Sequence, residues 1–417
     1  MLKCINPRIR FQEFKSWWEP IKLTDLGQSV GGTAIESEFN PEGKYKVISI
    51  GSYSEESEYK DQGIRAVYSK KTEKRILEKD DLTMILNDKT STGKIIGRVL
   101  LIDEDNSYVY NQRTQRIILN KNKFVPGFIF QLLNADINRN KIVRSAQGNT
   151  QIYVNWSDIS NLEYLIPESI EEQSAIGSLF RTLDELLASY KDNLANYQSL
   201  KLTMLFKMFP KAGQNVPEIR LDGFEGEWEV QILKEIASFS KGNGYTKNDL
   251  VNSGKEIILY GRLYTNYQIV ISKVNTFVTT VKASTVISKG GEVIVPASGE
   301  SAEDISRASV VEKSGIILGG DLNIIYPDEN KVDSIFLALT ISNGSQQKEL
   351  IKRAQGKSVV HLRNNDLEKV VLHYPSMEEQ HAIGTYFLNL DNLITTYQEK
   401  ISQLDTLKKK LLQDMFM

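Results

Sequence analysis

One segment of this chain occurs twice, once in each half. Glu171-Glu172-Gln173-Ser174-Ala175-Ile176-Gly177 opens the first copy, and Glu378-Glu379-Gln380-His381-Ala382-Ile383-Gly384 opens the second. In each copy an uninterrupted apolar helix pattern follows for about forty residues and ends in Met-Phe, at Met208-Phe209 and Met415-Phe416. A repeat of this length, with so long a helix in each copy, predicts two long helices that each follow a globular domain of their own.

The match between the copies extends to the beginning and the end of each domain. The arm Pro7-Arg8-Ile9-Arg10-Phe11 matches Pro217-Glu218-Ile219-Arg220-Leu221. Ahead of each helix, Ala146-Gln147-Gly148 matches Ala354-Gln355-Gly356 at nearly the same offset. The chain therefore divides into two copies of one unit, with a first domain at 1–166, its helix at 167–210, a second domain at 211–374 and its helix at 375–417.

The segments between these matched ends, about residues 30–140 and 240–350, differ from each other in sequence. Both contain short runs rich in β-branched residues and bordered by Gly, Asn, Asp or Ser, which is typical of short strands. Phe128–Leu133 and Ile335–Ile341 are apolar runs that predict short helices. The expected fold class is α+β, with two mixed α/β domains. The predicted strands are Tyr45–Ile50, Ile95–Leu101, Gln115–Leu119, Ile257–Tyr260, Val270–Ser272, Glu292–Val295, Gly315–Leu318 and Asn323–Tyr326.

Each long helix carries the alternating four- and three-residue spacing of the a and d positions of a coiled coil. Forty residues at about 1.5 Å each would extend roughly 60 Å, which exceeds the reach of one domain and disfavours the alternative that each helix packs only on its own domain. We expect the two helices to form an antiparallel coiled coil with pseudo-twofold symmetry. The predicted seam consists of Ile176, Phe180, Leu183, Leu187, Tyr190, Leu194, Tyr197, Lys201 and Met204, with Ile383, Phe387, Leu390, Ile394, Tyr397, Ile401, Leu404, Lys408 and Leu411.

Lys201 and Lys408 interrupt the apolar seam at matching positions. A polar residue at a core position can fix the register and the partner of a coiled coil, whereas a lysine can also extend its ammonium group out of a seam into water. The sequence leaves both interpretations open. At the helix starts, Ser169 and Ser376 stand three residues before a glutamate, which predicts a capping box in each copy.

The sequence contains no pattern that predicts a catalytic or metal site. His361, His373 and His381 have no cysteine neighbour and no spacing typical of zinc ligands. Gly356-Lys357-Ser358 lacks the first glycine of a phosphate-binding loop. No Asn/Asp-Pro-Pro-aromatic tetrapeptide, the type that holds a flipped base for amino methylation, occurs. We therefore predict a chain without catalytic residues, without a metal and without a cofactor of its own.

Composition and charge limit the partners. No apolar run approaches the roughly 18 to 20 residues of a membrane span, so no membrane partner is expected. The single cysteine, Cys4, excludes an intrachain disulfide; residues 1–7 lack the apolar core of a signal peptide, and both fit a cytoplasmic protein. The net charge of −2 means that any contact with nucleic acid must come from a local basic face.

The repeated arms, the Ala-Gln-Gly turns, the Glu-Gln-x-Ala-Ile helix starts and the Met-Phe ends together resemble the specificity subunit of type I restriction–modification enzymes. The resemblance covers nearly the whole chain in both copies. In the second domain, Ile258–Tyr264 and Pro296-Ala297-Ser298-Gly299 are similar to segments common in the family's target recognition domains. In the first domain, Asn87-Asp88-Lys89-Thr90-Ser91 stands in place of the second of these segments.

The resemblance implies a non-catalytic, DNA-binding subunit. Each domain would read one half of an asymmetric, bipartite site in double-stranded DNA, and the helices would set the half-site spacing and dock two modification subunits. Those subunits would carry S-adenosylmethionine and methylate adenine, and restriction subunits would use ATP and Mg to translocate and cleave DNA. The alternatives are a coiled-coil scaffold that does not read DNA and a specificity subunit of a type II-like fused methyltransferase–nuclease.

Candidate DNA-binding residues are the basic, amide and hydroxyl side chains in the polar stretches of both domains, because such groups read base edges in a groove. The Ala-Gln-Gly turns have an alternative role, which is only to shape the exit of each domain. Trp18 and Trp228 are expected to anchor the arms rather than to stack on bases. The candidates are Arg65, Lys89, Ser91, Arg113, Arg116, Arg144, Gln147, Asn149 and Gln151 in the first domain, and Tyr260, Arg262, Tyr264, Ser298, Arg307, Arg353, Gln355, Lys357 and His361 in the second.

Overall fold

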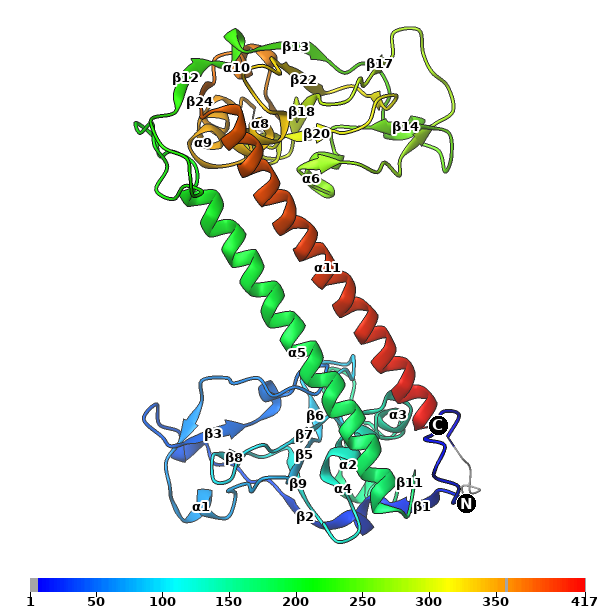
Figure 1. Cartoon of the computed structure of the whole chain (residues 1–417). Helices are drawn as coiled ribbons and strands as arrows, with labels where there is room; N and C mark the ends of the chain where they lie inside the picture. The colour runs from blue at the N-terminus through cyan, green and yellow to red at the C-terminus, as the bar shows by residue number, and fades with distance from the viewer. Residues whose placement is uncertain (1–6, 357–358, 417) are drawn as a thin grey trace. The chain divides into compact units, whose positions relative to one another are not determined.

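The computed structural model describes residues 7–356 and 359–416, so Cys4 and Lys357 lie outside the described residues. The chain forms two compact units, Met1–Lys191 with Glu399–Met417, and Asp192–Gln398. Two long helices, α5 (Ile170–Lys207) and α11 (Met377–Met415), contribute one part to each unit (Figure 1). Each unit therefore contains one globular domain, the start of the helix that follows it and the end of the other helix.

The first domain is built on an antiparallel sheet of order β2-β9-β5-β7, with α2 packed against it. A smaller sheet, β4-β3-β8, pairs β3 and β8 in parallel. The bounds are β1 Glu19–Lys22, η1 Leu23–Leu26, β2 Gly27–Gly31, η2 Glu36–Glu38, β3 Tyr45–Ile48, η3 Ile50–Ser52, β4 Arg65–Ala66, α1 Lys70–Glu73, β5 Leu82–Ile85, β6 Asn87–Asp88, β7 Val99–Leu101, β8 Tyr108–Tyr110, β9 Thr114–Leu119, α2 Pro126–Asn134, α3 Asp136–Arg144, β10 Ile152–Tyr153, α4 Trp156–Ile159 and β11 Glu163–Ile166.

The second domain has a five-stranded sheet of order β13-β22-β18-β20-β15 and a four-stranded sheet of order β16-β14-β21-β17. The bounds are β12 Glu229–Ile232, η4 Leu233–Glu235, β13 Ala237–Lys241, η5 Lys247–Asp249, β14 Lys255–Ile258, α6 Arg262–Thr265, β15 Val270–Ile271, β16 Phe277–Val278, β17 Val286–Ile287, β18 Val293–Pro296, β19 Ser298–Gly299, α7 Ala302–Ile305, β20 Ser309–Val311, β21 Ile317–Leu318, β22 Leu322–Pro327, α8 Ser334–Ile341, α9 Gly344–Arg353, β23 Val360–His361, α10 Asn364–Leu367 and β24 Val371–Tyr374.

The two domains share one construction although their middle segments differ in sequence. In the larger sheets, β2 pairs with β9 from Gly27 opposite Leu119, and β13 pairs with β22 from Ala237 opposite Pro327. The smaller sheets agree as well, because Val47 lies opposite Val109 in parallel and Ile257 lies opposite Ile317 in parallel. Buried strand positions require only apolar side chains of suitable size, so the common fold survives the sequence divergence.

The expected fold class, α+β with two domains that are each followed by a long helix, is confirmed. Every predicted strand overlaps an observed strand, and the two predicted short helices are α2 and α8. The sequence did not predict β2, whose side chains are half-buried or exposed, or α9, whose sequence is mostly polar. Val30 is the one large apolar residue of β2, and α9 has only Leu350 and Ile351, which are too few for an apolar pattern to be recognised in the sequence.

The first residues of each long helix fasten it to the arm of the same domain. Arg10 Nε and Nη2 each lie 2.6 Å from a carboxylate oxygen of Glu172, and Arg220 makes the same two 2.6 Å bonds to Glu379. Both glutamates are 1% exposed. The predicted capping boxes are therefore wrong in part, because only the serine half of each box forms. Ser169 and Ser376 accept the backbone N–H groups of the glutamates at 3.1 and 3.4 Å, while the glutamate side chains turn to arginine.

The next residue, a fully buried glutamine, fastens the helix to the domain core. Gln173 Oε1 accepts from Val125 N at 2.9 Å, and its Nε2 donates to the carbonyls of Lys123 and Pro167. Gln380 repeats this pattern with Asp333 N and the carbonyls of Lys331 and Pro375. These bonds satisfy the amide groups of the two glutamines, which are 0% exposed, and join them to backbone groups at the entrance to α2 and α8.

The glycine that ends each repeated motif allows another helix to approach closely. A Cβ atom on Gly177 would lie 3.0 Å from Phe128 N in α2, and one on Gly384 would lie 3.3 Å from Ile335 Cγ2 in α8. A larger residue would push these helices apart.

The Met-Phe ends fill the aromatic core of the unit in which each helix finishes. In one unit Phe416 contacts Trp18, Phe128 and Phe180 at 5.6–6.2 Å between ring centroids. In the other, Phe209 contacts Trp228, Phe336 and Phe387 at 5.8–6.2 Å. Trp18 and Trp228 are 1% and 2% exposed, so the tryptophans anchor the arms as expected.

Within each unit the two helix segments run antiparallel. Phe180 contacts Phe416 while Asp184 pairs with Lys408, and Tyr197 contacts Tyr397 while Phe209 contacts Phe387. The seam residues nearest the domains, which are Ile176, Phe180, Leu183, Leu187, Ile383, Phe387 and Leu390, are buried, and the other seam residues are half-buried.

The two seam lysines form ion pairs with aspartates of the facing helix segment. Lys201 Nζ binds Asp391, and Lys408 Nζ lies 2.5 Å from Asp184. Each lysine side chain is 22% exposed. The aspartates, like the lysines, occupy matching positions of the two copies, so one interaction is made twice. A lysine with a fixed partner across the seam favours the register-setting interpretation.

The buried Arg220–Glu379 pair gives a prediction for stability. Glu379→Ala leaves the Arg220 guanidinium, whose side chain is 16% exposed, without its counter-charge. It should lower the free energy of unfolding by about 3–5 kcal/mol, measured by denaturant unfolding of the full chain. The control is Glu55→Ala, which removes the partner of Lys94 from a pair whose side chains are 51% and 59% exposed; that change should cost under about 1 kcal/mol. Equal effects of the two variants would contradict this account.

Candidate nucleic-acid interface

A cavity of about 790 Å³ opens in the first domain and brings together polar residues from distant parts of the sequence. One wall comes from η2 and the segment at η3, a second from β6 and the residue after it, a third from the turn before β9, and a fourth from the hairpin that ends in β10. The lining residues are Glu36, Ser49, Ile50, Gly51, Asn87, Lys89, Asn111, Gln112, Arg113, Gln151 and Tyr153.

The Ala-Gln-Gly turn forms a tight hairpin at the edge of this cavity. Gln147 and Tyr153 exchange two backbone hydrogen bonds of 2.9 Å, and Gly148 has a φ of +102°. A Cβ atom on Gly148 would lie 2.2 Å from Gln151 O. The second domain repeats the hairpin with Gln355 and His361, and a Cβ atom on Gly356, at φ +139°, would lie 1.9 Å from Val359 O. Only glycine fits both turns.

The hairpins pair with equivalent short strands. β10 pairs with β6, with Tyr153 opposite Asn87, and β23 pairs with β19, with His361 opposite Ser298. Residues 87–89 therefore take the place of residues 298–300. Likewise, Arg113 precedes β9 as Asp321 precedes β22, and both residues have a positive φ, +67° and +58°.

This correspondence places opposite charges at equivalent positions of the two domains. Where the first domain has Lys89 and Arg113, the second has Glu300 and Asp321, and all four residues are exposed. The two surfaces present different hydrogen-bonding groups from one backbone frame.

Three of the predicted first-domain residues, Lys89, Arg113 and Gln151, meet in the cavity. Ser91, Arg144, Gln147 and Asn149 are outside the set that lines it. Arg65 lies elsewhere and makes two bonds of 2.7 and 2.8 Å to Asp61.

Arg116 pairs with a buried carboxylate inside the domain. Its guanidinium lies 2.5 Å from Asp81 and donates to the carbonyl of Ile76, and the side chain is 15% exposed. A guanidinium paired with a buried carboxylate stabilises the domain, and the predicted DNA contact of Arg116 stays a prediction.

Two predicted residues of the second domain are likewise committed to the fold. Ser298 is 5% exposed and donates to Asp321 Oδ2 at 3.1 Å. Arg262 donates to the carbonyl of Lys273 and to the side chains of Asn275 and Gln268, and burial lowers the pKa of this guanidinium. Arg262 therefore fixes the loop that follows α6, and the predicted DNA contacts of Arg262 and Ser298 stay predictions.

The remaining second-domain candidates differ in how far their side chains are exposed and in which side chains they contact. Gln355 and His361 are exposed on the hairpin, and Lys357 lies in the gap of the described chain. Tyr260 and Tyr264 are half-buried, with ring centroids 6.2 Å apart. Half-buried Arg353 pairs with Glu349 at 2.8 Å, and Arg307 lies 5.5 Å from the centre of the Tyr267 ring.

The sequence prediction did not select Glu36, although this residue lines the cavity. Asn111 Nδ2 and Gln112 Nε2 donate to its Oε1 at 3.0 and 2.9 Å, and the bond from Asn111 is the main cause of its lowered pKa. A single glutamate has no sequence signal that distinguishes it from a solvated surface residue. Only the fold reveals its neighbours.

Two kinds of feature are absent from the described part of the chain. In residues 7–356 and 359–416, no group of His, Cys, Asp or Glu side chains has the arrangement of a metal site. No helix in the same residues is long and apolar enough to cross a membrane.

The comparisons with known proteins agree with the repeated architecture. A family model described as "Type I restriction modification DNA specificity domain" matches twice, over residues 15–196 and 225–406. The chain belongs to this family. The two matches each include one globular domain and most of the long helix after it, so the duplication seen in the sequence is a duplication of the family's domain.

Similar proteins extend over the whole chain. The type I restriction enzyme MjaVIII specificity subunit of Methanocaldococcus jannaschii is 20% identical over 410 residues, which cover 95% of this chain and 91% of the relative. The S subunit of a type I restriction-modification system from M. genitalium has a crystal structure with a TM-score of 0.64, 17% identity and 99% coverage of both chains. A chain from a structure on the assembly and conformational transition of the type I R-M system has a TM-score of 0.53, 16% identity and coverage of 100% and 99%.

The hairpin glycines give a prediction. Gly148→Ala forces a side chain onto Gln151 O at a positive φ, so it should destabilise the hairpin by about 1–3 kcal/mol. Amide hydrogen exchange of Gln147 and Tyr153, which donate the two hairpin bonds, should accelerate, while exchange in β2 and β9 should not. Gly127→Ala in α2 is the control, since no atom lies within 4 Å of its Cβ position. Unchanged protection of both amides in Gly148→Ala would refute the role of the turn.

Proposed function

We propose that this chain is the DNA sequence-recognition subunit of a type I restriction–modification complex and that each domain reads one half of a bipartite, asymmetric site. The observation that carries the proposal is the pair of charge reversals on a common frame: Lys89 and Arg113 in the first domain stand where the second has Glu300 and Asp321. Cationic side chains read guanine, and carboxylates read cytosine amino groups. Two such surfaces suit two different half-site sequences.

The long helices are proposed to set the half-site spacing and to dock two modification subunits. Their outer faces carry exposed apolar side chains, among them Leu186 and Leu200 on α5 and Leu407 on α11, each 36–45% exposed. Leu200 and Leu407 occupy equivalent positions of the two copies. Exposed apolar groups at equivalent positions of both helices suit two copies of one partner.

The chemistry is proposed to reside in the partners. Modification subunits would hold S-adenosylmethionine and methylate adenine, and restriction subunits would hold ATP and Mg. This chain would have no catalytic activity and would decide where the partners act, in the cytoplasm. A coiled-coil scaffold would have no need for different polar surfaces on matched frames, which favours recognition. A subunit for a type II-like fused methyltransferase–nuclease would use the same surfaces with another partner.

The proposal predicts methylation that depends on this chain. Co-expression with the neighbouring modification subunit should produce methyladenine at one bipartite motif, detected by mapping modified adenines across a genome. Replacing both Lys89 and Arg113 by Ala should weaken binding of the complex to that motif by about 10–100-fold per lost base contact. The control Lys94→Ala removes an exposed lysine outside the cavity lining and should leave the motif unchanged.

Three results separate the candidate functions. Methylation without the chain would exclude the recognition role. Methylation that requires the chain but follows no motif would favour the scaffold. A single motif whose two halves are separated by a fixed spacer would support the proposal.

A further inference from the structure

An acidic side chain lies in the cavity of the first domain, where the other charged residues are Lys89 and Arg113. DNA carries a negative phosphate along each strand at every nucleotide, so a carboxylate on a DNA-facing surface is repelled by the backbone. Its favourable position is opposite a base amino group, which donates hydrogen bonds in the major groove. Attraction to phosphate therefore does not explain why a carboxylate lies at this position of the cavity.

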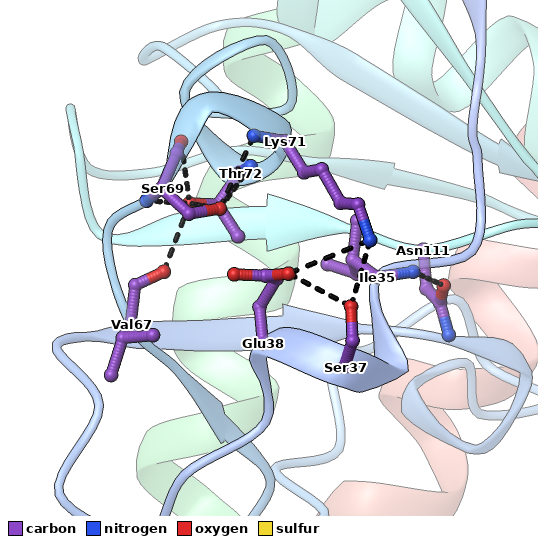
Figure 2. A network of polar contacts seen from close by, with 8 residues as sticks. All are labelled: Ile35, Ser37, Glu38, Val67, Ser69, Lys71, Thr72 and Asn111. Atoms are coloured by element: carbon purple, nitrogen blue, oxygen red, sulfur yellow. Dashed lines mark hydrogen bonds and ion pairs between the residues drawn. The ribbon is translucent and has the colours of Figure 1, made fainter.

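The Glu36 carboxylate is held in place and kept ionised. Asn111 and Gln112 both donate to Oε1, and the Asn111 bond is the main cause of the lowered pKa of Glu36. Asn111 itself is 7% exposed, and its Oδ1 accepts from the backbone N–H groups of Ile35 and Gln112 at 3.1 and 2.8 Å. Figure 2 shows the Asn111 side chain directed at the Ile35 nitrogen. Asn111 is thus a positioning residue for the carboxylate.

The other end of η2 is fastened separately (Figure 2). Glu38 Oε1 accepts from Ser37 Oγ at 2.8 Å and lies 3.6 Å from Lys71 Nζ, which also donates to Ser37 Oγ at 2.9 Å. Lys71 belongs to α1, whose Ser69 and Thr72 cap the helix reciprocally. Glu38 therefore has a cation of its own, and its surroundings account for its charge.

Glu36 has no such cation within the described chain. The residues that the structure describes form no ion pair with Glu36, Lys89 or Arg113, although all three line one cavity. The cavity thus presents an acceptor and two donors that do not neutralise one another by contact. Such groups are available to a ligand with the complementary pattern.

The major-groove edge of a G·C pair has that pattern. Guanine offers the acceptors N7 and O6, and cytosine offers the N4 amino donor. We propose that the first-domain cavity reads a G·C pair, with Glu36 accepting from cytosine N4 and with Lys89 and Arg113 donating to guanine. The proposal rests on the proposed function and names the specificity determinant of one half-site.

The assignment is particular to the first domain. When the two copies are aligned by their arms, the residue corresponding to Glu36 is Thr246, whose hydroxyl caps η5 and donates to Asp249. A change at Glu36 should therefore alter one half-site and leave the other intact.

The test uses the complex of the full chain with its modification subunits. The wild-type motif is mapped first, and binding is then measured to duplexes in which each cytosine of a half-site is replaced in turn by 2-pyrimidinone, which lacks the N4 amino group. One replacement should weaken wild-type binding by about 10–100-fold. The same replacement should weaken binding by Glu36→Gln less than about 3-fold. Asn111 and Gln112 donate to Oε1, so they hold the amide oxygen of the glutamine, and its NH2 group then faces the cytosine amino group as a second donor.

The matched control is Glu38→Gln, two residues away, which should retain both the wild-type motif and the full effect of the replacement. Selectivity at one G·C pair of one half-site should be lost in Glu36→Gln only. If Glu36→Gln does not assemble, the wild-type duplex series decides, and insensitivity to every amino deletion in both half-sites overturns the inference. A motif altered at an A·T pair, or unaltered, also overturns it. If the wild-type chain directs no motif at all, the proposed function fails, which is a different result.

Discussion

The pairing of a buried glutamate at the start of each long helix with an arginine of the preceding arm is the interaction on which the rest of the structure depends. Glu172 with Arg10 and Glu379 with Arg220 connect segments that lie at opposite ends of a domain's sequence. Each pair fixes the arm, the helix start and the domain core at one place, and the adjoining glutamine attaches the same turn to the loop before α2 or α8. Two buried charges are costly to remove from water, so this geometry requires both partners. The shared position of the arm and helix is what allows the segments between them to diverge.

The divergent segments present different polar surfaces on the common frame. Arg113 and Asp321 occupy one turn position with the same unusual backbone conformation, and Lys89 and Glu300 follow equivalent short strands. A recognition protein benefits from this separation, because polar side chains on a rigid frame can change without loss of the fold. The charges at these positions, rather than the near-neutral total, carry the proposed information about DNA sequence.

The sequence predicted the repeated parts well because their signals are physical and local. The heptad spacing fixes helix type and seam, and each predicted strand follows from apolar, β-branched runs. The roles of Glu172 and Ser298 could not be predicted in the same way. Glu172 fits a capping box by spacing, but a distant arginine and Trp18 take its side chain. Ser298 lies in a family-like segment, yet its hydroxyl is committed to Asp321. Glu36 had no signal at all. Each of these three cases depends on a partner supplied by the tertiary fold.

Each domain's recognition surface, from the start of its divergent segment to the end of its Ala-Gln-Gly hairpin, should determine one half-site. This is tested by replacing residues 30–153 with residues 240–361, and then mapping methyladenine directed by the complex. The expected result is a new motif made of two copies of the second half-site, with the spacer unchanged. Retention of the original first half-site, with methylation intact, would contradict it.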